Sequence, residues 1–118
     1  QTVDIFNPKT IRATMGSIIR VPFVYVPDLA PVLEQMHAKG IHTYAAHLKG
    51  QEYYDSFSFR EPTAFLIGNE GNGLSKEISD QAGQYLKIPM EGRVESLNAS
   101  IAAALLMYEA HRQRSARL

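Results

Sequence analysis

The chain has 118 residues, 12 basic and 12 acidic side chains, 45% hydrophobic residues and no cysteine. This length fits one domain with a substantial core, and the lack of cysteine excludes a disulfide framework and a thiolate metal site. The balanced charge argues neither for nor against nucleic acid, because a local basic patch can bind phosphates on a neutral protein. No apolar run approaches the roughly 20 residues that span a bilayer, no signal peptide is recognisable, and a cytoplasmic protein is expected.

Helices and strands are predicted to alternate in the first half of the chain. Apolar side chains recur at helical spacing after Asn7-Pro8 and again after Asp28, and asparagine and aspartate are favoured at a helix N-cap. The second of these helices would turn four apolar side chains inward, namely Leu29, Val32, Leu33 and Met36. In chain order, the predicted elements are a helix over residues 7–19, a strand over 23–26, a helix over 29–39, a strand over 41–48 and a loop over 49–62.

The second half continues this alternation. Ser75 and Ser96 each stand where a helix N-cap is expected. The predicted elements are a strand over residues 64–67, a helix over 75–82, a strand over 85–88, a loop over 90–95 and a helix over 96–114. One apolar face of the last helix is formed by Leu97, Ile101, Leu105 and Tyr108. Alternating strands and helices indicate an α/β fold with a mostly parallel sheet and helices on both faces.

A glycine-rich loop is the most informative stretch, with the sequence FLIGNEGNGL at residues 65–74. It indicates a strand, a tight turn of bare backbone and a helix start, and ligands of open α/β sheets bind outside the carboxyl ends of strands. The loop is neither GxGxxG nor a P-loop, which counts against a dinucleotide or triphosphate. A tight turn without a ligand is the alternative. Glu70 can hold a ligand hydroxyl or a cation, or accept backbone N–H groups that fix the loop.

A second marked stretch, IPMEGRVESLN, covers residues 88–98. Ser96 can act simply as an N-cap, or the free N–H groups of this helix start can hold a polar ligand group. The arginines that could contact phosphate, each more often solvated surface, are Arg12, Arg20, Arg60 and Arg93. The basic stretch over residues 111–117 is interpreted as a frayed helix end, with a nucleic-acid contact as the alternative. The four histidines lack metal-ligand spacing, so no metal is expected.

Taken together, these stretches resemble the SpoU/TrmH family of RNA 2′-O-ribose methyltransferases, in the SPOUT class. Residues 65–74 resemble the second family motif, and residues 88–90 and 95–100 with the alanine-rich helix that follows resemble the third. Residues 12–22 resemble the stretch between the first and second motifs. The first motif, with its catalytic arginine, is not found, and Asn7 and Arg12 do not match it. We therefore expect residues 1–118 to be a single SPOUT domain that lacks its N-terminal portion.

The resemblance implies a C-terminal trefoil knot, a rare exception to the usual topology, and S-adenosylmethionine bound within it. It also implies a homodimer that acts on RNA (rRNA or tRNA). Ile88 and Leu97 would sandwich the adenine, and the polar residues left for catalysis are Glu70, Ser96 and Asn98. The implied cofactor pocket consists of Leu66, Ile67, Gly68, Asn69, Glu70, Gly71, Ile88, Met90, Ser96, Leu97 and Asn98. The alternatives are a non-catalytic RNA-binding or dimerisation module and a generic nucleotide-binding domain.

Overall fold

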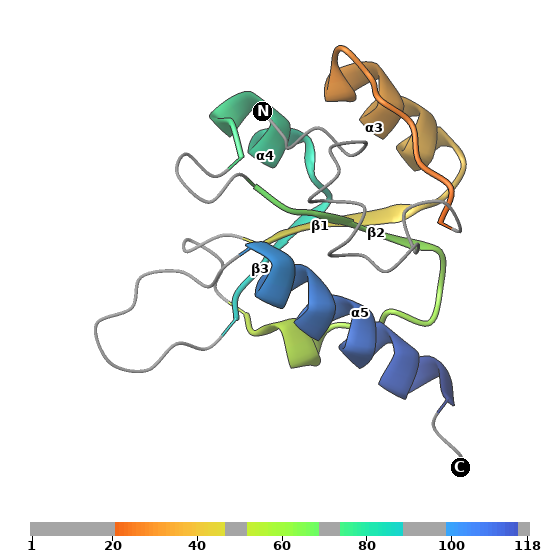
Figure 1. The fold of residues 1–118 in the computed structure, drawn as a ribbon, viewed down its shortest axis with the longest axis vertical. Helices are drawn as coiled ribbons and strands as arrows, with labels where there is room; N and C mark the ends of the chain where they lie inside the picture. The colour runs from red at the N-terminus through yellow and green to blue at the C-terminus, as the bar shows by residue number, and fades with distance from the viewer. Residues whose placement is uncertain (1–20, 47–51, 69–73, 89–98, 116–118) are drawn as a thin grey trace, which may run out of the picture.

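The computed structural model describes residues 21–46, 52–68, 74–88 and 99–115. The predicted helix over residues 7–19 and the predicted loop over residues 90–95 lie outside these ranges. The described elements (Figure 1) are α3 (Leu29–Ala38), β1 (His42–Ala46), the 3₁₀ helix η1 (Tyr54–Ser56), β2 (Thr63–Leu66), α4 (Lys76–Gln81), β3 (Gln84–Leu86) and α5 (Ala99–Ser115).

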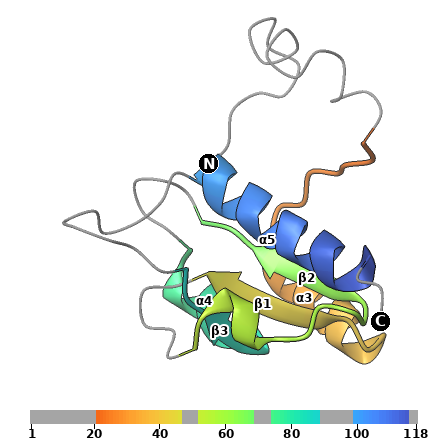
Figure 2. The ribbon, with the colours of Figure 1, turned by 90° about the horizontal axis from the view of Figure 1, so that it is seen from below.

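The three strands form one parallel sheet in the order β2-β1-β3. Tyr44 in the central strand is in register with Phe65 of β2 and Gln84 of β3. Helices α3 and α4 lie on one face of the sheet and α5 lies on the other (Figures 1 and 2). The predicted parallel sheet with helices on both faces is therefore confirmed for the described part of the chain.

Each face of the sheet carries its own apolar cluster, because successive side chains of a strand point to opposite faces. The α5 face holds a cluster of four buried residues, which we call the aromatic cluster: Tyr44, Phe59, Leu86 and Leu106. The α3 and α4 face holds a second cluster of buried residues: Leu33, Ala45 and Leu66. Leu86 is the last residue of β3 and Leu66 is the last residue of β2. The core therefore reaches the strand ends, where the predicted ligand loops begin.

Helix α3 forms as its sequence predicts. The Asp28 side chain accepts a hydrogen bond from the Ala30 N–H at 3.1 Å, which satisfies a donor of the first turn. Gly40, with a φ of +79°, follows the last turn in the left-handed conformation that favours glycine. Leu33 is buried, but Leu29 is 39% exposed, so the expectation that Leu29 faces inward is wrong. Leu29 is the first residue of the helix, at the edge of the face that packs on the sheet.

Residues 23–26 do not form the predicted strand. Val24 is 80% exposed and Tyr25 is 60% exposed, and no described strand pairs with this segment. A β-rich composition stabilises a strand through cross-strand packing and ladder hydrogen bonds rather than through an intrinsic backbone preference. Without a neighbouring strand, the composition alone does not produce the element.

Helix α5 packs on the sheet through a different face from the apolar one that its sequence pattern marks. Its buried residues are Ala102, Leu106 and Glu109. The residues of the marked apolar face are largely exposed: Ile101 at 52%, Leu105 at 37% and Tyr108 at 74%. The apolar side chains of Ile101, Leu105 and Tyr108 therefore lie on the outside of the helix.

The C-terminal part of α5 holds the segment before β2 in place. Gln113 accepts a hydrogen bond from the Phe59 N–H at 2.6 Å and donates one to the Phe57 carbonyl at 2.9 Å. The Arg114 guanidinium donates to the carbonyls of Phe59 and Glu61 at 2.8 and 2.9 Å. These contacts order part of the predicted loop over residues 49–62, and the helix is regular through Ser115 rather than frayed from residue 111.

Glu109 makes the stability of the folded chain depend on pH through its contacts at this end of α5. Hydrogen bonds from Arg112 lower the pKa of Glu109 below its ordinary value of 4.5, although partial burial acts in the opposite direction, and Gln113 adds a further bond. The unfolded chain thus binds this proton more readily than the folded one. We expect the stabilisation to be complete above pH 4.5 and to disappear as the pH falls through the lower, folded-state pKa. Urea unfolding between pH 3 and 6 would show a smaller pH slope for Glu109→Gln, and an equal slope would contradict the assignment.

Candidate ligand site at the carboxyl ends of the strands

The parallel arrangement brings the carboxyl ends of β1, β2 and β3 to one edge of the sheet. Ala46 of β1 is in register with Leu86 of β3, and the neighbouring Ala45 is in register with Leu66 of β2. The chain continues from β2 into Ile67 and Gly68, and from β3 into Lys87 and Ile88. The two predicted motifs therefore begin at the same edge, on either side of the central strand.

Ile67 and Ile88 both lie on the α5 face of the sheet. Both side chains are partly buried and pack against the aromatic cluster. Leu66, one residue earlier, belongs to the cluster on the opposite face and is 8% exposed. A ligand on the α5 side would thus touch the side chains of Ile67 and Ile88, but it could meet Leu66 only through the backbone.

Two sets of hydrogen bonds fix the segments that lead to the site. The Lys87 N–H donates to the Glu52 carbonyl at 2.9 Å, and the Lys87 carbonyl accepts from the Tyr54 N–H at 2.8 Å. On the other side, Ser75 caps α4 by accepting a hydrogen bond from the Ile78 N–H at 3.2 Å, as its sequence predicts. The backbone on both sides of the site is therefore held by partners outside the strands themselves.

Tyr44 belongs to the aromatic cluster against which Ile67 and Ile88 pack, and its side chain is neutral. Burial, and then the negative charge of Glu61, raise the pKa of the Tyr44 phenol, so the hydroxyl stays protonated and donates to the Ser58 carbonyl at 3.4 Å. The Tyr44 ring packs edge-on against the Phe59 ring, with 5.1 Å between their centroids. The sequence pattern did not identify Phe59 as part of this support.

An open groove runs beside the site between β2 and α5. Its volume is about 500 Å³, and its apolar lining includes Phe65 and Ile67 from the β2 side and Ala103 and Met107 from α5. Helix α5 runs antiparallel to β2, since Arg114 near its end binds the Glu61 carbonyl just before β2 begins (Figure 2). The start of α5 is thereby placed at the carboxyl edge of the sheet, beside Ile67.

The structure describes only part of the predicted pocket. It places Ile67 and Ile88 against the same cluster, with Gly68 next to Ile67 in the chain, and Leu66 in the cluster on the opposite face. The other predicted pocket residues lie outside the described ranges: Asn69, Glu70, Gly71, Met90, Ser96, Leu97 and Asn98. In the described part of the chain, no group of three or more acidic, histidine or cysteine side chains has the geometry to hold a metal ion.

These features define a parallel α/β domain with a candidate ligand site where two strands end. The model of the SpoU rRNA Methylase family matches residues 1–108, so this chain belongs to that family. A TrmH family protein of Bacillus subtilis (strain 168), YacO, is 38% identical over 104 residues, which cover 88% of this chain and 42% of YacO.

Two solved structures extend the likeness to three dimensions. The SpoU methyltransferase AviRb from Streptomyces viridochromogenes, solved in complex with the cofactor AdoMet, is 36% identical with a TM-score of 0.87, over 98% of this chain and 46% of AviRb. An RNA 2′-O ribose methyltransferase is 32% identical with a TM-score of 0.85, over 97% of this chain and 44% of that one. The chain thus spans less than half the length of these relatives. No helix in the ranges that the structure describes is both long and apolar enough to cross a membrane.

Proposed function

We propose that this protein is an S-adenosylmethionine-dependent RNA methyltransferase that acts on a ribose 2′-OH of rRNA or tRNA, and that residues 1–118 supply its cofactor-binding part. The observation that carries the proposal is the convergence of Ile67 and Ile88 on one cluster, at the carboxyl edge of a parallel sheet. This chain matches 46% of AviRb, and AviRb was solved in complex with AdoMet. The RNA 2′-O ribose methyltransferase among the similar structures supports the proposed reaction.

The described residues suit this cofactor. Ile67 and Ile88 present partly buried apolar surface, which favours the flat, largely apolar face of an adenine. Gly68, also partly buried, has no side chain to keep a ligand from the main chain. In the proposal, Leu97 covers the other face of the adenine, and the backbone of residues 66–71, with Met90 and Ser96, completes the pocket. The trefoil knot that would bring these loops together remains part of the proposal.

The cofactor's sulfonium supplies an electrophilic methyl group. The chain must then hold the ribose hydroxyl in line with it and assist the loss of the hydroxyl proton. Glu70, Ser96 and Asn98 are the polar side chains that we propose for orienting the ribose and accepting hydrogen bonds at this site. The positive end of the dipole of α5, which begins at Ala99, would favour an anionic or partly negative group beside them.

A homodimer through α5 is part of the same proposal. The outward face of this helix presents Leu105 and Tyr108 to solvent in the single chain. An apolar face on a regular, well-packed helix is typical of a surface that a second copy covers. RNA would then reach the site across both subunits.

Calorimetric titration with S-adenosylmethionine and S-adenosylhomocysteine tests the cofactor site, and methylation of total rRNA and tRNA with a labelled methyl donor tests the reaction. We expect binding of both compounds, and loss of most methyl transfer in Glu70→Ala and Asn98→Ala. Glu34→Ala, at an exposed position on α3, is the matched control and should remain active. RNA binding without cofactor binding would instead indicate a docking module, and full activity of both variants would contradict the site.

A further inference from the structure

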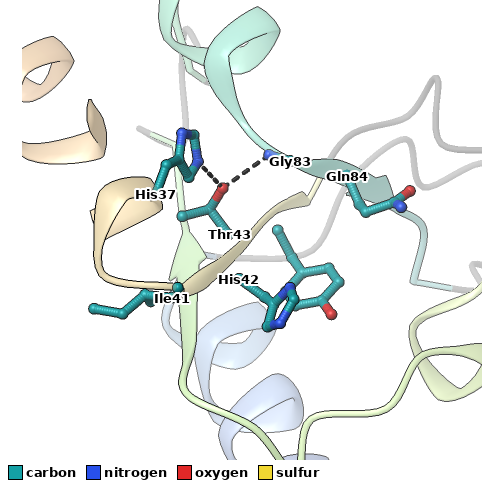
Figure 3. A pocket seen from close by; sticks show the side chains of 8 residues that line it. His37, Ile41, His42, Thr43, Gly83 and Gln84 are labelled. Carbon is teal, nitrogen blue, oxygen red and sulfur yellow. Dashed lines mark hydrogen bonds between the residues drawn. The ribbon is translucent and has the colours of Figure 1, made fainter. Parts of the chain in front are cut away.

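A buried hydroxyl ties three elements together at the opposite end of the sheet from the cofactor site. Thr43 in β1 is 1% exposed, and its Oγ1 lies 2.8 Å from His37 Nε2 at the end of α3 and 2.8 Å from the Gly83 nitrogen just before β3 (Figure 3). We propose that Thr43 is a positioning residue, which fixes the register of β3 on β1 and so sets the position of Ile88 in the cofactor site. This inference rests on the function proposed above.

The Thr43 hydroxyl has partners from two different elements. A threonine hydroxyl has one proton to donate and two lone pairs that accept. The Gly83 N–H donates to Oγ1, and the hydroxyl proton is free to be donated to Nε2 when that nitrogen of His37 acts as the acceptor. In this arrangement His37 turns the hydroxyl proton toward α3 and leaves a lone pair of the oxygen directed at Gly83.

Strand β3 is held beyond its end by the backbone hydrogen bonds of Lys87 to Glu52 and Tyr54, and at its start by the bond from Gly83 to Thr43. It is three residues long, and only Gln84, Tyr85 and Leu86 are in register with residues of β1. The Gly83 backbone approaches β1 so closely that an added Cβ would lie 3.1 Å from the Thr43 carbonyl oxygen. A side chain at this position would require the Thr43 carbonyl to move, so glycine suits the close approach of the Gly83 N–H to the buried hydroxyl.

A shift of β3 by one residue would be transmitted directly to the site. Each residue of a strand advances about 3.3 Å, and a slip of one residue turns every side chain to the opposite face of the sheet. Leu86 and Ile88 are two residues apart and both contact the aromatic cluster. A slip would remove both from the cluster at once, so Ile88 would no longer pack against the cluster that Ile67 also contacts.

The alternative is that Thr43 only adds stability, as any buried hydrogen bond does. The two roles predict different effects of a variant on the cofactor affinity of the folded protein. A purely stabilising role lowers the unfolding midpoint and leaves cofactor affinity untouched. A positioning role weakens cofactor binding in the folded protein, more than an equally destabilising change elsewhere does.

The test uses Thr43→Val, which keeps the shape and removes the hydroxyl, and Thr43→Ser, which restores it. The control is Asp28→Ala, which removes the α3 N-cap and destabilises the protein without touching the contact between β1 and β3. S-adenosylmethionine and S-adenosylhomocysteine are titrated into each full chain by calorimetry at a temperature where thermal unfolding shows it folded. We expect the dissociation constant to rise about fivefold or more in Thr43→Val and to stay near the original in Thr43→Ser and Asp28→Ala.

Unchanged affinity in Thr43→Val, or an equal loss in Asp28→Ala, would overturn the positioning role while leaving the proposed function intact. If Thr43→Val does not fold, His37→Ala takes its place, because it removes only the partner that orients the hydroxyl. A smaller loss of affinity in His37→Ala supports the inference. An unchanged affinity in His37→Ala overturns it. If the original protein binds neither compound, the proposed function fails and this inference fails with it.

Discussion

Replacing Phe59 with alanine is expected to lower the free energy of unfolding by about 3–5 kcal/mol, as deletion of a fully buried aromatic side chain does. Phe59 is 0% exposed, and its ring packs edge-on against the rings of Tyr44 and Phe65, with centroids 5.1 and 5.0 Å away. Its loss would leave a cavity under both Ile67 and Ile88, since these side chains contact the same cluster. Urea unfolding followed by circular dichroism would measure the effect.

The control for this prediction is Tyr53→Ala. Tyr53 lies in the same segment but is 45% exposed, and the Lys87 ammonium lies 5.5 Å from its ring centroid. We expect this change to cost about 1 kcal/mol or less, because an exposed cation–π contact contributes little. Equal losses of stability in the two variants would show that Phe59 does not support the core as its burial indicates.

The burial of Phe59 illustrates what the sequence could not predict. Residues 49–62 have no periodic pattern, and the segment before β2 is held by groups from a helix far along the chain. Gln113 and Arg114 bind it across 54 and 55 residues of sequence. Neither residue type indicates such a role, since both are common on solvated helix surfaces. Contacts of this kind depend on how elements pack, and local patterns contain no information about them.

Elements defined by local signals were predicted well. Helix α3 has a capping aspartate before it and a glycine with positive φ after it, so both of its ends are encoded within a few residues. Strands β1 and β2 are short apolar runs, and both lie within about two residues of the predicted bounds. The proposed ligand site was predicted by the same logic, from glycines that follow a strand end. Its full geometry depends on residues 69–73 and 89–98, which the structure does not describe.

The last helix shows where apolar periodicity misleads. Leu105 and Tyr108 suggest a core-facing stripe, yet the buried residues of the helix are Ala102, Leu106 and Glu109, which is paired with Arg112. Periodicity indicates which residues avoid water, but it does not distinguish a core from a subunit interface. A helix with one face on its own sheet and a second apolar face outside is consistent with the proposed dimer, in which both faces are covered.

Changing Leu105 to glutamate is therefore expected to convert the proposed dimer into a monomer while the fold persists. Leu105 is 37% exposed in the single chain, so a glutamate there remains hydrated in the monomer. In a dimer it would be an unpaired buried charge, whose cost we expect to raise the dissociation constant roughly a hundredfold or more. Sedimentation equilibrium over a range of protein concentrations measures this constant.

Gln35→Glu is the matched control for this change. It adds the same charge to α3, at an exposed position on the other face of the sheet, and should leave the dimer intact. Far-ultraviolet circular dichroism would verify that both variants keep their helices. A dimer of Leu105→Glu as tight as that of the original protein would place the subunit contact elsewhere. Dissociation that occurs only in Leu105→Glu would assign the outward face of α5 to the second copy, because the added charge is the same in both variants and only its position differs.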